Sequence, residues 1–260
     1  MTDIDLTTAA NILIQRRLTG TTGDRLPLDA RPQTLDDAIA LQQAVTAHWC
    51  ETQDDTIGGW KCLLPPEGKL IVGPIYTRTI DSVAPVALWP QKGVARIEPE
   101  LAFFIQADLP PRDHAYSRAE IDAAIGRTHM ALELIFCRYN DSSQCEFPEM
   151  LGDGLVNQGL FIGPEVDSSA AAQSAEMAIH VNYTDHQQTF AGKHPNQDPR
   201  APLYWLVNYL REQGVGLEAG QAIITGSFAG VIEVPLDTDI HIEYANLGAM
   251  QVNFNARKAQ

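Results

Sequence analysis

The sequence is poor in cysteine and in long apolar runs, and each shortage excludes a class of protein. Its 260 residues include four cysteines, with no CxxC pair and no histidine at zinc-finger spacing, which argues against a structural zinc site. Scattered thiols of this kind are typical of a reducing compartment. No apolar run reaches the ~18 residues that a membrane-spanning helix needs. The first 20 residues lack the apolar core of a signal peptide. We therefore expect a cytoplasmic protein without a membrane partner.

Basic residues are also scarce. The chain has 33 acidic residues against 18 Lys and Arg, a formal net charge of −15, and only five of its residues are lysines. Such a charge opposes binding to phosphate backbones or anionic lipids, so nucleic acid is not expected as a partner. A basic side chain inside an apolar stretch is therefore a stronger candidate for a specific role.

The pattern of the chain predicts an α+β fold. Residues 7–20 and 34–51 have the apolar spacing of amphipathic helices, the second with Thr34 as N-cap. From about residue 80, short strands with frequent turn signals predict a β-rich roll rather than a doubly wound parallel sheet. Helices at 117–129 and 202–214 interrupt these strands. We expect a smaller helical and mixed region at residues 1–80 and a β-roll of mixed sheets at residues 81–260.

Three glutamates stand out because their neighbours are apolar. In RIEPELAFFI (96–105), Glu98 and Glu100 are two residues apart and would share one face of a strand. Glu133 lies inside HMALELIFCRY (129–139), and a carboxylate enclosed by aliphatic residues is seldom unpaired. Three carboxylates favour Mg²⁺ or Mn²⁺. The alternative is that Glu98 and Glu100 line the wet face of a half-covered strand. Pro99 predicts a sheet edge or a bulge.

Several segments together resemble the fumarylacetoacetate hydrolase superfamily, in particular its branch of 2-oxopent-4-enoate hydratases and 4-oxalocrotonate decarboxylases. The resemblance runs from about residue 30 to the C-terminus. It rests on the order of these segments: GGWKC, RIEPELAFFI followed by ADLP, ALELIFCRY, GDGLVNQGLFIGP, KHPNQDPRAPLYWLVNYL and IITGSF. It implies a β-roll of the fumarylacetoacetase C-terminal type and assembly into homo-oligomers.

The resemblance also implies roles for individual residues. The metal ligands would be Glu98, Glu100 and Glu133, and Lys61 would be the active-site lysine. Asp153 matches a second catalytic acid. The remaining matched positions are a substrate-binding turn and a preceding His-Pro pair: Thr225, Gly226, Ser227, His194 and Pro195.

Residue chemistry leaves alternatives open at three of these positions. Burial beside Trp60 and Cys62 would depress the pKa of Lys61 and suit it to proton transfer, but a surface lysine fits equally well. Asp153 before Gly154 is also typical of a turn. The same holds for His194, which precedes a proline.

The expected function is a metal-dependent hydratase of aromatic catabolism, which acts on a 2-hydroxy-2,4-dienoate or 2-oxo-4-enoate through a metal-stabilised enolate. A 4-oxalocrotonate-type decarboxylase is the alternative, and additional bases such as Lys69 or Arg78 near the site would favour it. A C–C bond hydrolase would need a His–Glu pair, for which the sequence offers no evident candidate. A non-catalytic, metal-binding homologue also fits.

One departure from the branch bears on the reaction. The loop after Lys61 is short, and no aspartate precedes Gly73 where the hydratases carry an acid. Glu67 and Lys69 are the candidates to replace that acid.

Overall fold

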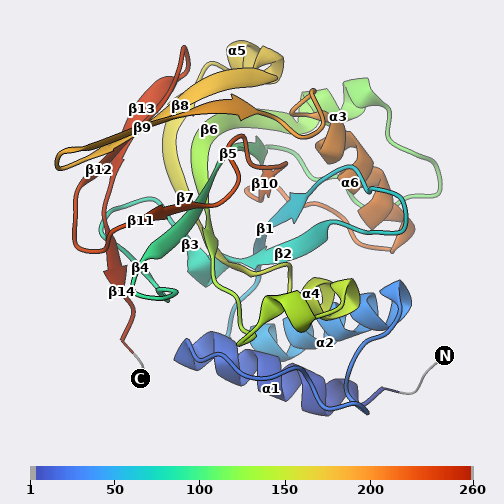
Figure 1. The fold of residues 1–260 in the computed structure, drawn as a ribbon. Helices are drawn as coiled ribbons and strands as arrows, with labels where there is room; N and C mark the ends of the chain where they lie inside the picture. Colours follow the sequence, from blue (N-terminus) through green and yellow to red (C-terminus); the bar gives the residue numbers. More distant parts are fainter. Residues whose placement is uncertain (1–3, 259–260) are drawn as a thin grey trace.

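The computed structural model describes residues 4–258 and combines helices with strongly curled sheets (Figure 1). Helix α2 begins at the predicted cap, Thr34, which forms a capping box with Asp37, and Asp5 caps α1. Ser117 and Glu120 form the same motif at α3. The helical elements are α1 (Leu6–Thr19), α2 (Leu35–Gln53), η1 (Thr77–Thr79), α3 (Arg118–Ala124), η2 (Ser142–Gln144), α4 (Phe147–Gly152), α5 (Ser168–Gln173) and α6 (Ala201–Glu212).

The strands of the described residues form three sheets. The largest has the order β2-β1-β10-β5-β6-β7-β3, with β11 also paired to β5. The second has the order β13-β12-β8-β9, and β14 pairs with β4. The strands are β1 (Ile57–Cys62), β2 (Val72–Tyr76), β3 (Ile80–Asp81), β4 (Val86–Leu88), β5 (Ala95–Ile105), β6 (Ile125–Ile135), β7 (Asn157–Val166), β8 (Glu176–Tyr183), β9 (His186–Lys193), β10 (Ala222–Ile224), β11 (Ile232–Val234), β12 (Ile240–Tyr244), β13 (Gly248–Val252) and β14 (Phe254–Ala256).

This α+β architecture confirms the predicted fold class. Mixed pairing is evident, because β1 runs parallel to β10 whereas β5 runs antiparallel to β6. Among the described residues, no helix has the length and apolarity required to cross a membrane.

The N-terminal region is divided between the helices and the main sheet. Helices α1, α2 and α4 lie together at one end of the molecule, beneath the strands (Figure 1). The strands β1 and β2, which also precede residue 80, belong to the same sheet as β5 and β6. The division into residues 1–80 and 81–260 stays a prediction, and its outer limits, residues 1–3 and 259–260, lie outside the described residues.

Pro99 lies neither on an edge strand nor at a bulge, so that expectation was wrong. It pairs with Leu132 inside β5, and the register shift between β5 and β6 falls instead between Phe103 and Ile105. On the other side of β5, the partners are β10 at residues 102–104 and β11 at residues 95–97. Pro99 therefore faces the gap between two successive partner strands, where its missing N–H breaks no ladder hydrogen bond.

Candidate active site

Three glutamates converge where β5 pairs with β6. Glu98 lies directly opposite Glu133 in the antiparallel register, and Glu100 lies opposite Ala131. Because alternate residues of a strand share a face, both β5 glutamates point to the same side as Glu133. Carboxylate oxygens of the three residues lie within 4.8 Å of one another. Glu100 and Glu133 are buried, and Glu98 is half-buried.

Lys61 joins this cluster from β1. It is paired with Ile224 of β10, which is paired with Ala102 of β5, so the lysine shares the face of the glutamates. Its ammonium Nζ lies 2.5 Å from Glu133 Oε1 and donates to the backbone carbonyl of Leu155 at 3.2 Å. The structure thus rules out the reading of Lys61 as a snorkelling surface residue.

The cluster lines a cavity of about 360 Å³, within the range of small-ligand sites. The walls beside the charged residues are largely apolar side chains. The wall residues are Cys62, Leu63, Ile71, Leu155, Val156 and Pro195, together with Gly226, Ser227 and Gly230.

The crowded acids change one another's pKa values. Burial, with the neighbouring Glu133 carboxylate, raises the pKa of Glu98 to about 7. Burial and the charges of Glu133 and Glu98 raise the pKa of Glu100 well above its usual value. Burial lowers the pKa of Lys61, but the attraction of Glu133 and Glu98 outweighs burial and the net shift is upward. The expectation of a depressed lysine pKa was therefore wrong.

The donor set fits a hard divalent cation. Glu133 Oε2 is buried and has no hydrogen-bond partner among the described residues. Glu100 Oε2 accepts from the backbone N–H of Gly226 at 2.7 Å. Three ionised carboxylates and one ammonium leave a formal charge of −2, which a divalent cation would balance. All-oxygen donors of this kind suit a hard ion rather than zinc or copper.

A loop with unusual backbone geometry supports the cluster from one side. Gly154, Leu155 and Val156 all have positive φ, at 73°, 53° and 61°. A β-branched residue such as Val156 rarely adopts this region, so the surrounding contacts must hold it there. The loop ends at Asn157, whose side-chain amide donates to Glu133 Oε1 at 2.9 Å. The backbone and the side chain of this loop thus position both Lys61 and Glu133.

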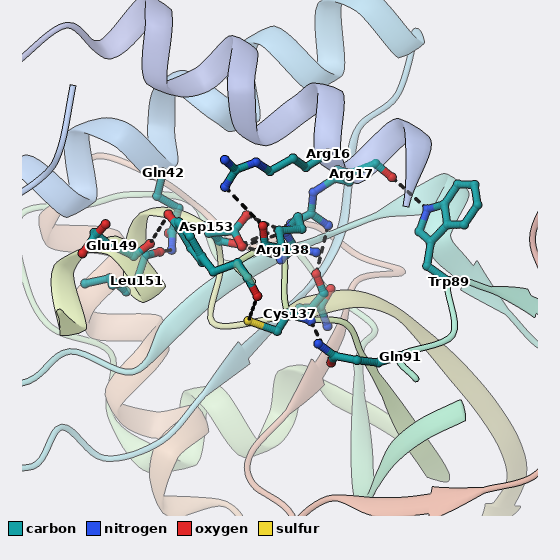
Figure 2. A network of polar contacts seen from close by, with 12 residues as sticks. Arg16, Arg17, Gln42, Trp89, Gln91, Cys137, Arg138, Glu149, Leu151 and Asp153 are labelled. Carbon is teal, nitrogen blue, oxygen red and sulfur yellow. Dashed lines mark hydrogen bonds and ion pairs between the residues drawn. The ribbon is translucent and has the colours of Figure 1, made fainter. Parts of the chain in front are cut away.

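A buried guanidinium network fixes that loop (Figure 2). Arg138 Nε donates to both carboxylate oxygens of Asp153, at 2.6 and 2.7 Å, and both side chains are fully buried. From α1, Arg17 donates to the backbone carbonyls of Asp153 and Asn157. Asp153 is therefore engaged by Arg138 and is not one of the residues that line the cavity.

The other matched residues lie around the turn after β10. Gly226 and Ser227 line the cavity, whereas Thr225 is buried behind them. His194 Nε2 lies 3.4 Å from Thr225 Oγ1, and its Nδ1 accepts from the backbone N–H of Asn196. Burial lowers the pKa of His194 to about 4, which keeps the ring neutral at pH 7.

The short loop after β1 brings no second charge to the cavity. Glu67 and Lys69 are exposed, and Lys69 Nζ lies 5.3 Å from the centre of the Phe147 ring. Arg78 lies 3.6 Å from Asp54 and lines a different cavity. Among the described residues that line the cavity of the three glutamates, Lys61 is the one base.

The sequence did not predict the residues of the 153–157 loop that support Glu133 and Lys61. Asn157 was visible inside GDGLVNQGLF, but its contact with Glu133 depends on the β6–β7 pairing. The left-handed conformation of Leu155 and Val156 could not be predicted, because neither residue type favours it.

No family model matches the chain. It is 28% identical to the 2-oxo-hept-4-ene-1,7-dioate hydratase of Escherichia coli over 168 residues, which span 62% of this chain and 62% of the hydratase. The 4-oxalocrotonate decarboxylase of Pseudomonas putida G7, in its complex with calcium and acetate, superposes with a TM-score of 0.77 at 19% identity, covering 96% of this chain and 97% of the decarboxylase.

A structure from Yersinia pestis CO92 that is described as a fumarylacetoacetate hydrolase family protein superposes with a TM-score of 0.54 at 16% identity. That superposition covers 78% of this chain and 94% of the Yersinia protein. The chain has the fumarylacetoacetate hydrolase fold. The sequence match and the full-length superposition together confirm the predicted resemblance to the hydratase and decarboxylase branch.

Proposed function

We propose that this protein is a metal-dependent hydro-lyase that adds water to a 2-hydroxy-2,4-dienoate or its 2-oxo-4-enoate tautomer. The observation that carries the proposal is the meeting of three glutamates with Lys61 on one wall of an otherwise apolar cavity. The relative in Escherichia coli, matched over 62% of its length, bears the name 2-oxo-hept-4-ene-1,7-dioate hydratase.

In this proposal, Glu98, Glu100 and Glu133 hold Mg²⁺ or Mn²⁺. A cation of this kind, when bound, acts as a Lewis acid that stabilises negative charge on the oxygens of a 2-oxo acid. The donor set supports this choice, and so does the 4-oxalocrotonate decarboxylase structure in complex with magnesium and adipate, which superposes with a TM-score of 0.76.

Lys61 is the proposed catalytic residue. Hydration of an alkene requires a proton on one carbon and the removal of a proton from water, and a positioned side chain must carry these protons. The Glu133 carboxylate and the Leu155 carbonyl hold the ammonium at the wall of the cavity. Lys61 is thus placed to deliver a proton to the substrate or to pair with its carboxylate.

The other side chains position and enclose the reactants. The turn at Gly226 and Ser227 would contact the substrate, while the N–H of Gly226 also fixes Glu100. Leu63, Ile71 and Val156 exclude water from the tail of the substrate. For Asp153, the ion pair with Arg138 favours a positioning role through the 153–157 loop over direct catalysis.

The apolar walls favour a substrate with one carboxylate. A 4-oxalocrotonate-type substrate, like the 1,7-dioate in the name of the Escherichia coli relative, carries a second carboxylate, and burying an unpaired carboxylate costs several kcal/mol. Lys69 and Arg78, the bases that would have favoured a decarboxylase, do not line this cavity. The cavity therefore suits a monocarboxylate with an apolar tail.

The test is a spectrophotometric assay of metal-loaded protein with 2-hydroxypenta-2,4-dienoate. Metal-stimulated loss of the dienol ultraviolet absorbance is expected, with little release of CO₂ from 4-oxalocrotonate. If Glu98→Gln retained both the metal and full activity, the proposed site would be wrong. A rise in melting temperature with Mn²⁺, but no turnover of either acid, would instead identify a non-catalytic metal-binding homologue.

A further inference from the structure

A second cavity, separate from the glutamate cluster, gathers basic residues in a chain that is otherwise strongly acidic. Its volume is about 590 Å³, and it lies where α1, α2 and the C-terminal segment meet. Its basic and aromatic lining residues are Arg17, Arg78, Arg257, Lys258, Trp49 and Trp89. The whole protein has a formal net charge of −15, so a cavity lined by four basic residues is unusual for this chain.

Arg17 lines this cavity and has no carboxylate partner among the described residues. Its side chain is buried, yet both terminal nitrogens donate to backbone carbonyls, and its Nε has no hydrogen-bond partner. Asp153, the acid nearby, is already bound by Arg138. Burial and the like charge of Arg138 lower the pKa of Arg17 to about 10. A buried guanidinium in this state gains from an added anion.

Arg257, near the C-terminal end of the described residues, also lines this cavity and is half-buried. It donates to the backbone carbonyl of Ala87, and its guanidinium lies 5.6 Å from the centre of the Trp89 ring. Burial lowers its pKa, against which the charge of Asp81 acts. Asp81 and Asp54, the latter near Arg78, leave an excess of positive charge in the cavity.

We propose that this basic cavity binds a small organic or inorganic anion that carries a carboxylate or phosphate group, as a second ligand of the protein. Guanidinium groups suit both anions because their planar donors match two oxygens at once. The site is distinct from the glutamate cluster, from which the 153–157 loop separates it. Arg17 binds this loop on one side, and Lys61 contacts it on the other.

The experiment measures anion binding to metal-free protein in EDTA, by isothermal titration at constant ionic strength. Inorganic phosphate and succinate are the two probes, so that the titration shows which acid group the cavity takes. EDTA removes any divalent cation that could bind either anion at the three glutamates, and the variants below show which cavity takes the probe. One saturable site per chain is expected for at least one probe. No saturable binding of either probe would overturn the proposal.

Two variants localise the binding. Arg257→Gln is expected to weaken the affinity at least tenfold, because it removes a charged donor. Arg78→Gln, at an exposed side chain, is expected to weaken it at least threefold. Arg127→Gln is the matched control, since Arg127 is exposed on β6 and does not line the cavity.

Equal affinity in Arg78→Gln and in the control, or equal weakening in all three variants, would contradict the placement. Because no turnover is measured, failure here leaves the proposed hydratase activity unaffected. Conversely, a result that excludes the hydratase activity would leave the proposed anion site unaffected.

Discussion

Replacement of Asp153 by asparagine tests how the 153–157 loop is held. Asp153 and Arg138 form an ion pair with both side chains fully buried, at 2.6 Å. Asparagine keeps the shape but removes the charge, so the guanidinium of Arg138 stays buried beside Arg17 without its counter-ion. Breaking a buried pair from one side costs about 3–5 kcal/mol. We expect the free energy of unfolding, from urea denaturation, to fall by that amount.

Two further variants give this measurement its controls. Glu176→Gln breaks the pair of Glu176 with Lys193, in which both side chains are more than 60% exposed, and should cost under about 1 kcal/mol. Arg138→Met combined with Asp153→Leu removes both buried charges, and it should be less destabilised than Asp153→Asn. If Asp153→Asn cost no more than Glu176→Gln, the buried pair would not hold the loop.

Three other predictions follow from the site. Lys61→Met should lower kcat by about 10²–10⁴-fold while Mn²⁺ still binds, and unchanged kcat would exclude proton transfer by this residue. Gly226→Ala should weaken Mn²⁺ binding at least tenfold, because the φ of Gly226 is +126° and a Cβ there would lie 2.5 Å from Leu63 Cδ2. Gly214→Ala is the control: the φ of Gly214 is +73°, the space around it is open, and Mn²⁺ binding should stay unchanged. The pKa of His194 is about 4 in the folded protein, below its ordinary value of 6.5. As the pH falls, His194 therefore takes up its proton in the unfolded chain before it does so in the folded protein. The free energy of unfolding should thus fall between pH 6.5 and pH 4, by at most about 1.4 kcal/mol per pH unit. Thermal unfolding of His194→Gln should show a weaker pH dependence over this window, and an unchanged one would contradict the assignment.

The fold and the convergence of the three glutamates could be predicted because they depend on local patterns. Alternation along β5 places Glu98 and Glu100 on one face, and the apolar neighbours of Glu133 indicate a buried strand. Capping residues such as Thr34 similarly mark the start of a helix. These signals lie within a few residues of the feature that they predict.

The supporting contacts could not be predicted, because they join distant parts of the chain. Arg17 on α1 reaches Asn157 across 140 positions, and nothing in the sequence around Arg17 marks that partner. Pro99 was misread for the same reason: the gap beside it arises from where β10 ends and β11 begins. The pKa of Lys61 was misjudged because its apolar sequence neighbours are visible, whereas the carboxylates that face it come from other strands.

The most direct test of the glutamate cluster compares thermal unfolding of the wild-type protein and Glu98→Gln, in EDTA and in Mn²⁺. In EDTA, removing one of three crowded carboxylates relieves repulsion, so the variant should be at least as stable as the wild type. With Mn²⁺ at about 100 times its Kd, the wild type should gain about 2.7 kcal/mol, and the variant far less. Glu243→Gln, at an exposed glutamate of β12, should behave as the wild type in both conditions. Equal stabilisation of wild type and Glu98→Gln by Mn²⁺ would show that the three glutamates do not form the metal site.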